Sequence, residues 1–302
     1  MANVLEELSA AVGQVVAKVG PSVVGVGRSG SGVVVAEGQV LTNAHNLRGE
    51  GVAVRFGDGR RAEGRAGGVD LDGDLAVVLV DTADSPPIEW ATAGASVGAA
   101  VVALAHGPGG GVRASLGFVS ATDAAFRGPG GRLVEGALEH TAPLARGASG
   151  GPVVDAAGRL LAVDTHRVGE GSYLAIVADA ELRARVEALG RGESPRRRRL
   201  GVAIAPPHVA RRLRRSVGLP EREGLLVLGV EEGGPAARAG LSKGDFVVAV
   251  DDRPVASVDD LAAALAAAAE GAPVQLAVVR GADELTVAVD LGAAGTVHEG
   301  SV

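Results

Sequence analysis

Two hydrophobic periods follow one another in the first two thirds of the chain. The apolar positions of residues 3–19 recur at helical spacing, and Pro21 ends that pattern. From Val23 to about Val177 the apolar residues instead form short runs, such as 32–36, which Gly, Asp or Pro separates. Short strands at this density, with no helices between them, predict an antiparallel barrel or sandwich.

The remaining third has a different pattern, in which helical and strand periods alternate. After a predicted helix over 179–189, the Gly-, Pro- and Arg-rich segment 190–199 indicates a linker. Beyond it we expect helices at 208–217, 235–241 and 258–269 among strands at 200–204, 224–230, 245–252, 274–281 and 284–291. The predicted organisation is a helical segment 1–20, a first domain 21–189, the linker, a smaller domain 200–292 and a flexible tail 293–302.

Composition limits the classes of function. The 302 residues suffice for two domains, and 47% of them are hydrophobic although only 2% are aromatic. A net charge of −7 argues against nucleic-acid binding by the chain as a whole. The run Arg196–Arg199 has no interleaved aromatic residues, so we expect a solvated linker, with an anionic lipid or nucleic-acid contact as the alternative. Because cysteine is absent, disulfides and thiol nucleophiles are excluded.

The N-terminus carries no convincing signal peptide, because Glu6 and Glu7 come early and no basic stretch precedes an unbroken apolar run. No segment approaches about 20 uninterrupted apolar residues, so we expect no membrane-spanning helix. These features predict a cytoplasmic protein as the sequence stands. A chain whose leader had been removed would look the same, so the cell envelope stays an alternative.

The candidate nucleophile is Ser149, which lies in the sequence RGASGGP (146–152) ahead of a predicted strand. A serine nucleophile needs a tight exposed turn, and flanking glycines let the chain turn without a Cβ clash. It also needs backbone N–H groups that receive a developing oxyanion, for which the amides of Gly147 and Ser149 are candidates. The alternative is an ordinary loop in a glycine-rich protein.

Two further residues complete a candidate triad. His45 follows a predicted strand, where its ring can face a cleft, and Asp74 immediately precedes an apolar strand. Asp70 and Asp72 compete with Asp74 for the same role. Each motif alone also fits a surface histidine or an Asp-rich turn. Together, the order His, Asp, Ser in an all-β context matches the chymotrypsin-type arrangement.

The chain resembles the HtrA (Deg) proteases in the stretches TNAHN (42–46), DGDLAVV (72–78) and GASGGPVVDAAGRLLAV (147–163). The resemblance implies a mainly β fold, a chymotrypsin-like double β-barrel followed by a smaller α+β PDZ domain. Carried over by position, it makes His45 the general base, Asp74 its orienting partner and Ser149 the nucleophile. Gly147 and Ser149 would donate to the oxyanion.

The chain also departs from the family's pattern. Ala148 stands where the family usually has Asn, although only the backbone matters at that position. The N-terminal aromatic residues of the family's trimer contacts are missing. This puts a trimer in doubt and leaves a homo-oligomer open.

The second domain carries the PDZ part of the resemblance, in GGPAARAGLSKGDFVVAVDDRPV (233–255). Ahead of it, a predicted loop and strand resemble the family's carboxylate-binding loop, with the peptide-binding residues Glu223, Gly224, Leu225, Leu226 and Val227. Free N–H groups in such a loop receive the C-terminal carboxylate of a peptide, and the strand's open edge pairs with that peptide. The predicted helix 258–269 would form the other wall of the groove.

The remaining motifs carry weaker signals. Residues 25–30 spell GxGxxG, but a strand follows rather than a helix, so a dinucleotide site is rejected. The other histidines show no metal-ligand spacing, so neither a metal nor a cofactor is predicted. Surface or structural roles are expected for His106, His140, His166, His208 and His298. Trp90 and Tyr173 are expected to pack in the core. Asp164 and His166 lie near the expected substrate-binding strand and are candidates for an influence on specificity.

These observations predict a serine endopeptidase that works through an acyl-enzyme. The expected partners are unfolded or damaged proteins, because the resemblance implies a PDZ domain that reads exposed C-termini or hydrophobic peptides. No nucleic acid is expected as a partner. The alternative from another class is a non-catalytic peptide-binding or chaperone module that retains the protease fold.

Overall fold

The computed structural model describes residues 3–49, 51–128, 133–168, 171–195, 199–206, 209–210, 212, 222–268 and 271–291. The chain divides into two compact units, 1–195 and 196–302. Among the described residues, strands account for 44% and helices for 19%, which confirms the mainly β prediction. Within the described ranges, no helix is long and apolar enough to cross a membrane.

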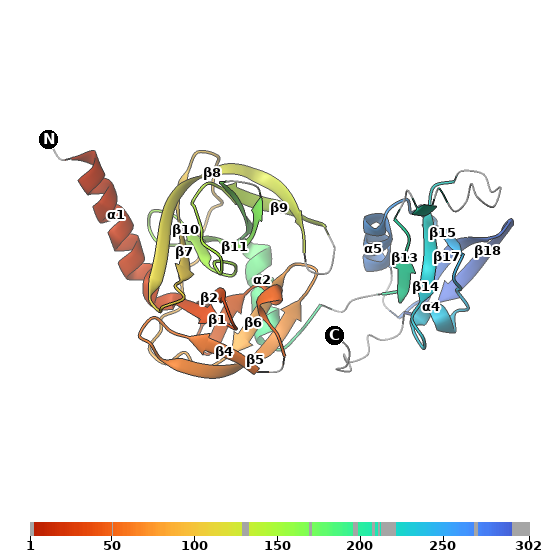
Figure 1. Ribbon diagram of the computed structural model, residues 1–302, viewed down its shortest axis with the longest axis horizontal. Coiled ribbons are helices and arrows are strands. Elements are labelled where there is room, and N and C mark those ends of the chain that lie inside the picture. The colour runs from red at the N-terminus through yellow and green to blue at the C-terminus, as the bar shows by residue number, and fades with distance from the viewer. Residues whose placement is uncertain are drawn as a thin grey trace. The chain divides into compact units, whose positions relative to one another are not determined.

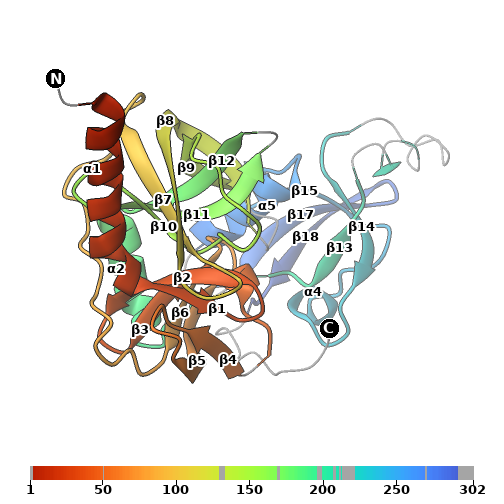
Figure 2. The same ribbon diagram turned by 60° about the vertical axis from the view of Figure 1, so that its left-hand side comes forward.

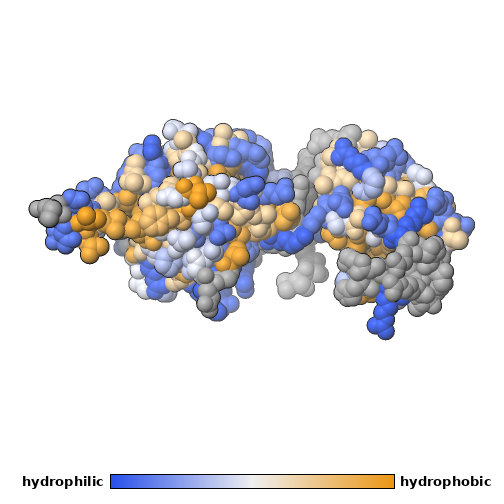
Figure 3. All heavy atoms as spheres, turned by 90° about the horizontal axis from the view of Figure 1, so that it is seen from above, coloured by the Kyte–Doolittle hydropathy of each residue, from blue (hydrophilic) through white to orange (hydrophobic). Residues whose placement is uncertain are grey.

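The first unit begins with helix α1 (Val4–Val19), which starts where the Asn3 side chain accepts a hydrogen bond from the Leu5 amide. The last turns of α1 bury Val15 and Val19, and Figure 2 shows the helix running beside the strands β7 and β8. Its first turns project from the barrels, and Figure 3 shows hydrophobic residues exposed there. A short 3-10 turn, η1 (Gly20–Ser22), follows, because Pro21 cannot continue the helix ladder.

The first β-barrel closes around a core of valines. Its strands, in barrel order, are β1 (Val23–Val26), β2 (Gly30–Ala36), β3 (Gln39–Thr42), β6 (Leu75–Leu79), β5 (Arg61–Asp70) and β4 (Gly51–Arg55). A 3-10 turn, η2 (Ala44–Asn46), follows β3. The short apolar runs predicted an antiparallel barrel or sandwich, and the structure shows a closed barrel, which leaves no strand edge unpaired.

The second barrel repeats the six-strand plan. Its strands, in barrel order, are β10 (Pro152–Val154), β11 (Leu160–Val168), β12 (Ser172–Val177), β9 (Leu133–His140), β8 (Val112–Arg127) and β7 (Ala100–His106). One hydrophobic core joins the two barrels and includes Leu41 and Leu75 from the first and Leu104 and Leu160 from the second. Helix α2 (Ala180–Gly190), capped by Asp179, adds its buried face to the same core. The seam between the barrels is therefore continuously packed (Figure 1).

The described part of the second unit contains a sheet, the helices α4 (Pro235–Arg238) and α5 (Val258–Ala267), and helical residues at 209, 210 and 212. The sheet order is β13 (Val202–Ile204), β14 (Leu225–Val230), β15 (Phe246–Val250), β17 (Val274–Arg280) and β18 (Asp283–Val289), with β16 (Arg253–Pro254) paired to β15. Ser257 and Asp260 form a capping box that starts α5.

Some sequence predictions fall on residues that the structure does not describe. These are most of the helix expected at 208–217, the tail 293–302 and three of the four arginines at 196–199. The fourth, Arg199, makes an exposed ion pair with Glu231 at 3.1 Å. Strand β9 ends at His140, so the segment from 141 to 148 that leads into the nucleophile turn is not strand.

Candidate active site

The pairing of β3 with β6 brings His45 and Asp74 together. Thr42, the last residue of β3, lies opposite Ala76 near the start of β6. Three residues beyond Thr42 and two residues before Ala76, the two side chains therefore meet at the same end of this strand pair. His45 Nδ1 lies 2.8 Å from Asp74 Oδ2 and 3.0 Å from Oδ1, and the His45 backbone N–H donates to Oδ1 at 3.2 Å.

The environment of Asp74 suits a buried carboxylate. Its side chain is fully buried, and its backbone adopts a left-handed conformation with φ of 54°. The Thr165 hydroxyl donates to Oδ2 at 2.7 Å, and the Asn43 side-chain amide donates to the Asp74 carbonyl oxygen at 2.9 Å. A carboxylate accepts only, so the His45 nitrogen that faces it, Nδ1, carries the proton. His45 Nε2 is then unprotonated and able to accept a proton.

The two competing aspartates differ from Asp74 in place and partners. Asp70 Oδ1 accepts the backbone N–H groups of Asp72 and Gly73 at 3.1 and 2.9 Å, and its Oδ2 lies 3.6 Å from a guanidinium nitrogen of Arg185. Asp70 therefore shapes the turn that presents Asp74. Within the described ranges, every hydrogen bond of the His45 ring goes to Asp74.

The turn that carries Ser149 requires glycine on both sides. Gly147 and Gly150 have φ of 92° and 90°, which side chains rarely adopt. A Cβ at Gly147 would clash with the carbonyl oxygen of Ser29, and one at Gly150 would clash with that of Ser31. The glycine-rich motif is thus a steric requirement of the place where the turn meets β2 and the residues just before it.

Residues of the first barrel make hydrogen bonds to the backbone carbonyl groups of this turn. The Ser31 N–H and the Asn46 side-chain amide donate to the Ser149 carbonyl at 2.9 and 2.8 Å. The Ser31 hydroxyl donates to the Gly147 carbonyl at 2.8 Å. From the second barrel, the Gly150 N–H donates to the Asp164 carbonyl at 2.8 Å. Ser149 is therefore fixed at the seam where both barrels meet.

The hydroxyl of Ser149 is hydrogen-bonded to Thr165 rather than to His45. Its Oγ donates to the Thr165 carbonyl at 2.9 Å, and no hydrogen bond joins it to His45 in the described part of the chain. A rotation of the serine side chain is the change that would bring Oγ to the imidazole. The backbone N–H groups of Gly147 and Ser149 donate to no described residue, which leaves both able to bind an oxyanion.

Sequence reasoning missed three parts of this site. Thr165 and Asn46 act through contacts with residues distant in sequence, for which no local motif exists. The third part is a second, buried His–Asp pair, in which His140 Nε2 lies 2.8 Å from Asp164 Oδ1. Burial raises the pKa of the Asp164 carboxyl, and His140 counteracts this shift. His140 Nδ1 accepts the Ala142 N–H at 3.2 Å, so this pair supports the segment that leads into the nucleophile turn.

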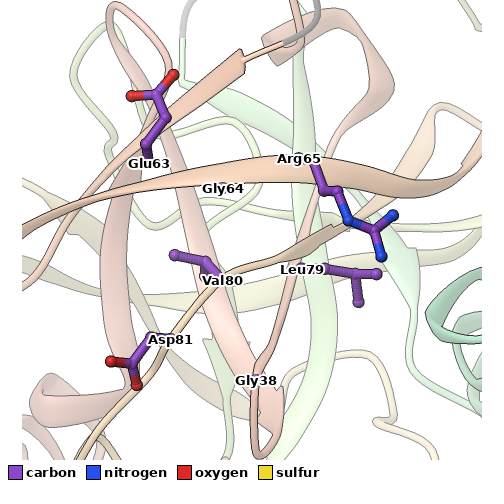
Figure 4. A pocket seen from close by; sticks show the side chains of 7 residues that line it. All are labelled: Gly38, Glu63, Gly64, Arg65, Leu79, Val80 and Asp81. Atoms are coloured by element: carbon purple, nitrogen blue, oxygen red, sulfur yellow. The ribbon is translucent and has the colours of Figure 1, made fainter.

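Two surface hollows of the first unit differ in their relation to this site. The first lies on the outside of the first barrel and is lined by Gly38, Glu63, Gly64, Arg65, Leu79, Val80 and Asp81. Figure 4 shows its charged side chains pointing in different directions, so they do not converge on a ligand. The second, of about 340 Å³, is lined in part by residues 143–146, directly ahead of the nucleophile turn.

The predicted peptide site of the second unit needs a correction. Gly224 has φ of 147°, and a Cβ there would clash with the Phe246 ring and the Val247 carbonyl. The following residues Leu225, Leu226 and Val227 are buried in strand β14, which pairs with β13 on one side and β15 on the other. The prediction that this strand offers an open edge to a peptide is wrong, because both of its edges are occupied. The described sheet ends in β13 on one side and in β18 on the other.

Comparisons with known proteins agree with this geometry. A family model described as a trypsin-like peptidase domain matches residues 30–163, and one described as a PDZ domain matches residues 199–291. The chain therefore carries a trypsin-like peptidase domain followed by a PDZ domain, and it is similar to HtrA-type proteases. It is 31% identical over 274 residues to a probable periplasmic serine endoprotease, DegP-like, from Halomonas elongata, covering 87% of this chain and 56% of the relative.

Two further comparisons show a similar extent of similarity. The putative serine protease HhoB of a Synechocystis strain is 29% identical over 280 residues, covering 87% of this chain and 66% of the relative. The solved structure of the HtrA-type protease AlgW with a decapeptide superimposes with a TM-score of 0.68 at 25% identity, covering 91% of this chain and 96% of that one. The chain spans between about half and two thirds of the length of the curated relatives named here.

Proposed function

We propose that this chain is an HtrA-type serine endopeptidase with Ser149 as nucleophile, His45 as general base and Asp74 as the residue that orients His45. One observation carries the proposal: an imidazole held by a buried carboxylate lies at the same seam as a serine on a glycine-flanked turn. The two amides on that turn that make no hydrogen bond support the assignment of Gly147 and Ser149 as the oxyanion donors.

The proposed reaction begins when Ser149 Oγ leaves the Thr165 carbonyl and turns to His45 Nε2. Nε2 takes the hydroxyl proton while Oγ attacks the peptide carbonyl carbon, and the two backbone N–H groups receive the negative oxygen. Protonated His45 then gives the proton to the leaving amine, the C–N bond breaks, and an acyl-enzyme remains. Water, activated by the same imidazole, attacks the ester carbonyl and releases the carboxylic acid and the serine.

The second unit is proposed to bind substrate peptides by strand addition to β13 rather than β14. A peptide needs a strand whose outer backbone groups are not paired, and β13 is the end strand of the described sheet that lies next to β14. Its Val202 and Ile204 are half-buried and Ala203 is exposed, so apolar side chains flank the available edge. Gly201, with φ of 73°, precedes the strand and gives the chain a turn ahead of it. The loop at Glu223 and Gly224 remains a predicted site for the peptide carboxylate.

The substrates are proposed to be unfolded or damaged proteins. Such chains expose extended segments and C-termini, which a protease cleft and a strand-adding domain both require. The relatives described as DegP-like are called periplasmic, and we propose the cell envelope as the compartment of this protein as well. Cell fractionation tests the compartment independently of the activity.

The test of the activity is cleavage of casein by the purified full chain and by its Ser149→Ala variant. The variant should lose at least about 10³-fold in rate, since removal of a triad nucleophile costs this much or more. Circular dichroism checks that the fold is kept. Activity of the variant equal to that of the unchanged protein, after contaminating proteases are excluded, would overturn the assignment. Peptide binding without any cleavage by the unchanged protein would favour the non-catalytic alternative.

A further inference from the structure

A second imidazole stands beside the candidate triad without belonging to it. The ring of His166, on β11, lies with its centroid 5.8 Å from that of His45, and the two planes are tilted by 57°. The His166 ring also lies 5.0 Å from the ring of Phe126, on β8. The aromatic contact with Phe126 limits the positions that the His166 ring can take next to His45.

Hydrogen bonds connect His166 to the carboxylate of the triad. Thr165 Oγ1 lies 2.7 Å from Asp74 Oδ2 and 2.8 Å from His166 Nδ1. The carboxylate can only accept, so the single hydroxyl hydrogen of Thr165 points to Asp74. Thr165 Oγ1 must then accept from His166, which places a proton on His166 Nδ1. The result is a directed chain from His166 through Thr165 to Asp74, and from there to His45.

We propose that His166 is a positioning residue that adjusts the basicity of His45, an inference that rests on the proposed protease function. Neutral His166 donates through Nδ1 and strengthens the hydrogen bond from Thr165 to Asp74, because hydrogen bonds in a chain polarise one another. This holds the carboxylate in place for His45. Protonated His166 puts a second positive charge next to the imidazolium that His45 must become during attack, and so opposes the reaction.

The surroundings of His166 determine the pH at which the change occurs. The charged or titratable groups that face it are His45, on η2, and Asp74, ahead of β6, while β8 contributes the uncharged Phe126. Burial lowers the pKa of the His166 imidazole, Asp74 raises it in part, and His45 lowers it further. His166 is therefore neutral near neutral pH, and it gains its proton only at acid pH.

Two protonations should then inactivate the enzyme toward acid pH, one at each imidazole. The second-order rate of reaction of Ser149 with a fluorophosphonate probe measures this without a peptide substrate. In that reaction Oγ bonds to phosphorus, fluoride leaves, and His45 takes the proton. For the full-length protein, the logarithm of this rate should rise with pH at a slope that approaches 2 at the acid end, down to about pH 4.5.

The His166→Gln variant should show a slope of about 1 over the same range, because only one titrating imidazole remains. Its rate at about pH 8 should fall by less than about tenfold, since the variant changes one hydrogen bond to Thr165 and removes no charge from neutral His166. His106→Gln is the matched control: His106 is another buried histidine of the same unit, and its pKa is also lowered by burial. The control should keep the slope of 2.

A direct titration covers the case in which His166→Gln does not fold. Nuclear magnetic resonance of the histidine ring protons in the Ser149→Ala protein should show that His45→Gln raises the pKa of His166, because a neighbouring positive charge has been removed. Two results would overturn the inference if Ser149 is still labelled. One is an equal slope in the unchanged protein and in His166→Gln, and the other is a pKa of His166 that does not change in His45→Gln. Absence of labelling in the unchanged protein would instead count against the proposed function itself.

Discussion

Replacement of Asp74 by asparagine should remove most of the activity while leaving the fold intact. The carboxylate accepts from His45 Nδ1, from the His45 backbone N–H and from the Thr165 hydroxyl. An asparagine of the same shape must present one NH₂ group to these three donors. The arrangement that fits best places this NH₂ group where Asp74 Oδ2 now lies, facing Thr165 Oγ1 and His45 Nδ1. The Thr165 hydroxyl can rotate to accept, and His45 Nδ1 must then become an acceptor as well. The ring proton then moves to Nε2, which can no longer take the proton of Ser149.

The expected size follows from the loss of the correct tautomer, which costs about 10⁴-fold in kcat in the triad of a trypsin-like enzyme, or about 5 kcal/mol of transition-state stabilisation. Asp70→Asn is the matched control, because Asp70 bonds to the backbone of its own turn and lies near Arg185. It should lower the rate by less than about tenfold. Steady-state cleavage of a fluorescent casein by both variants gives the comparison. Similar losses in the two variants would refute the proposed role of Asp74.

Three further predictions address the oxyanion site, the peptide site and the stability of the second unit. Gly147→Ala should reduce casein cleavage by about 10²-fold or more, measured well below the melting temperature, because the new Cβ meets the Ser29 carbonyl and shifts an oxyanion donor; the melting temperature should also fall, because the left-handed turn disfavours a side chain. Calorimetry with the Ser149→Ala protein should show weaker binding of a hydrophobic peptide when its C-terminus is amidated; equal affinities would exclude reading of the carboxylate. The Arg280 guanidinium holds the pKa of the Asp245 carboxyl below its usual range. The stability from this pair is therefore present above about pH 4 and is lost as the pH falls through the lowered pKa. Hydrogen exchange of β15 and β17 should accelerate as the pH falls through that value, and the acceleration should be much smaller in Arg280→Ala.

The extent to which sequence predicted the site depended on how local each feature is. Ser149, His45 and Asp74 each lie in a short motif beside a strand, so the sequence indicated all three. Their meeting depends on the register of β3 with β6 and on contacts across the barrel seam, which no local pattern contains. Thr165 was missed for the same reason, since its partner Asp74 is 91 residues away in the sequence.

The error in the second unit has the same origin. The segment at Leu225–Val230 has the apolar pattern of a strand, and that part of the prediction is confirmed by β14. Whether a strand lies at the end of a sheet depends on which other strands pair with it. The pairing of β14 with β13, through contacts such as Val202 with Val230, could not be read from either segment alone. The local motif therefore predicted the strand correctly, but the prediction that this strand has an open edge was wrong.

The nucleophile itself is tested most directly by locating a covalent label. The full-length protein is treated with a fluorophosphonate probe, digested, and analysed by peptide mass spectrometry. The account predicts a single modified residue, Ser149, with labelling abolished in Ser149→Ala and strongly reduced in His45→Ala. A folded protein that takes up no label, or that carries the label on another residue, would contradict the claim that Ser149 is the nucleophile of a serine protease.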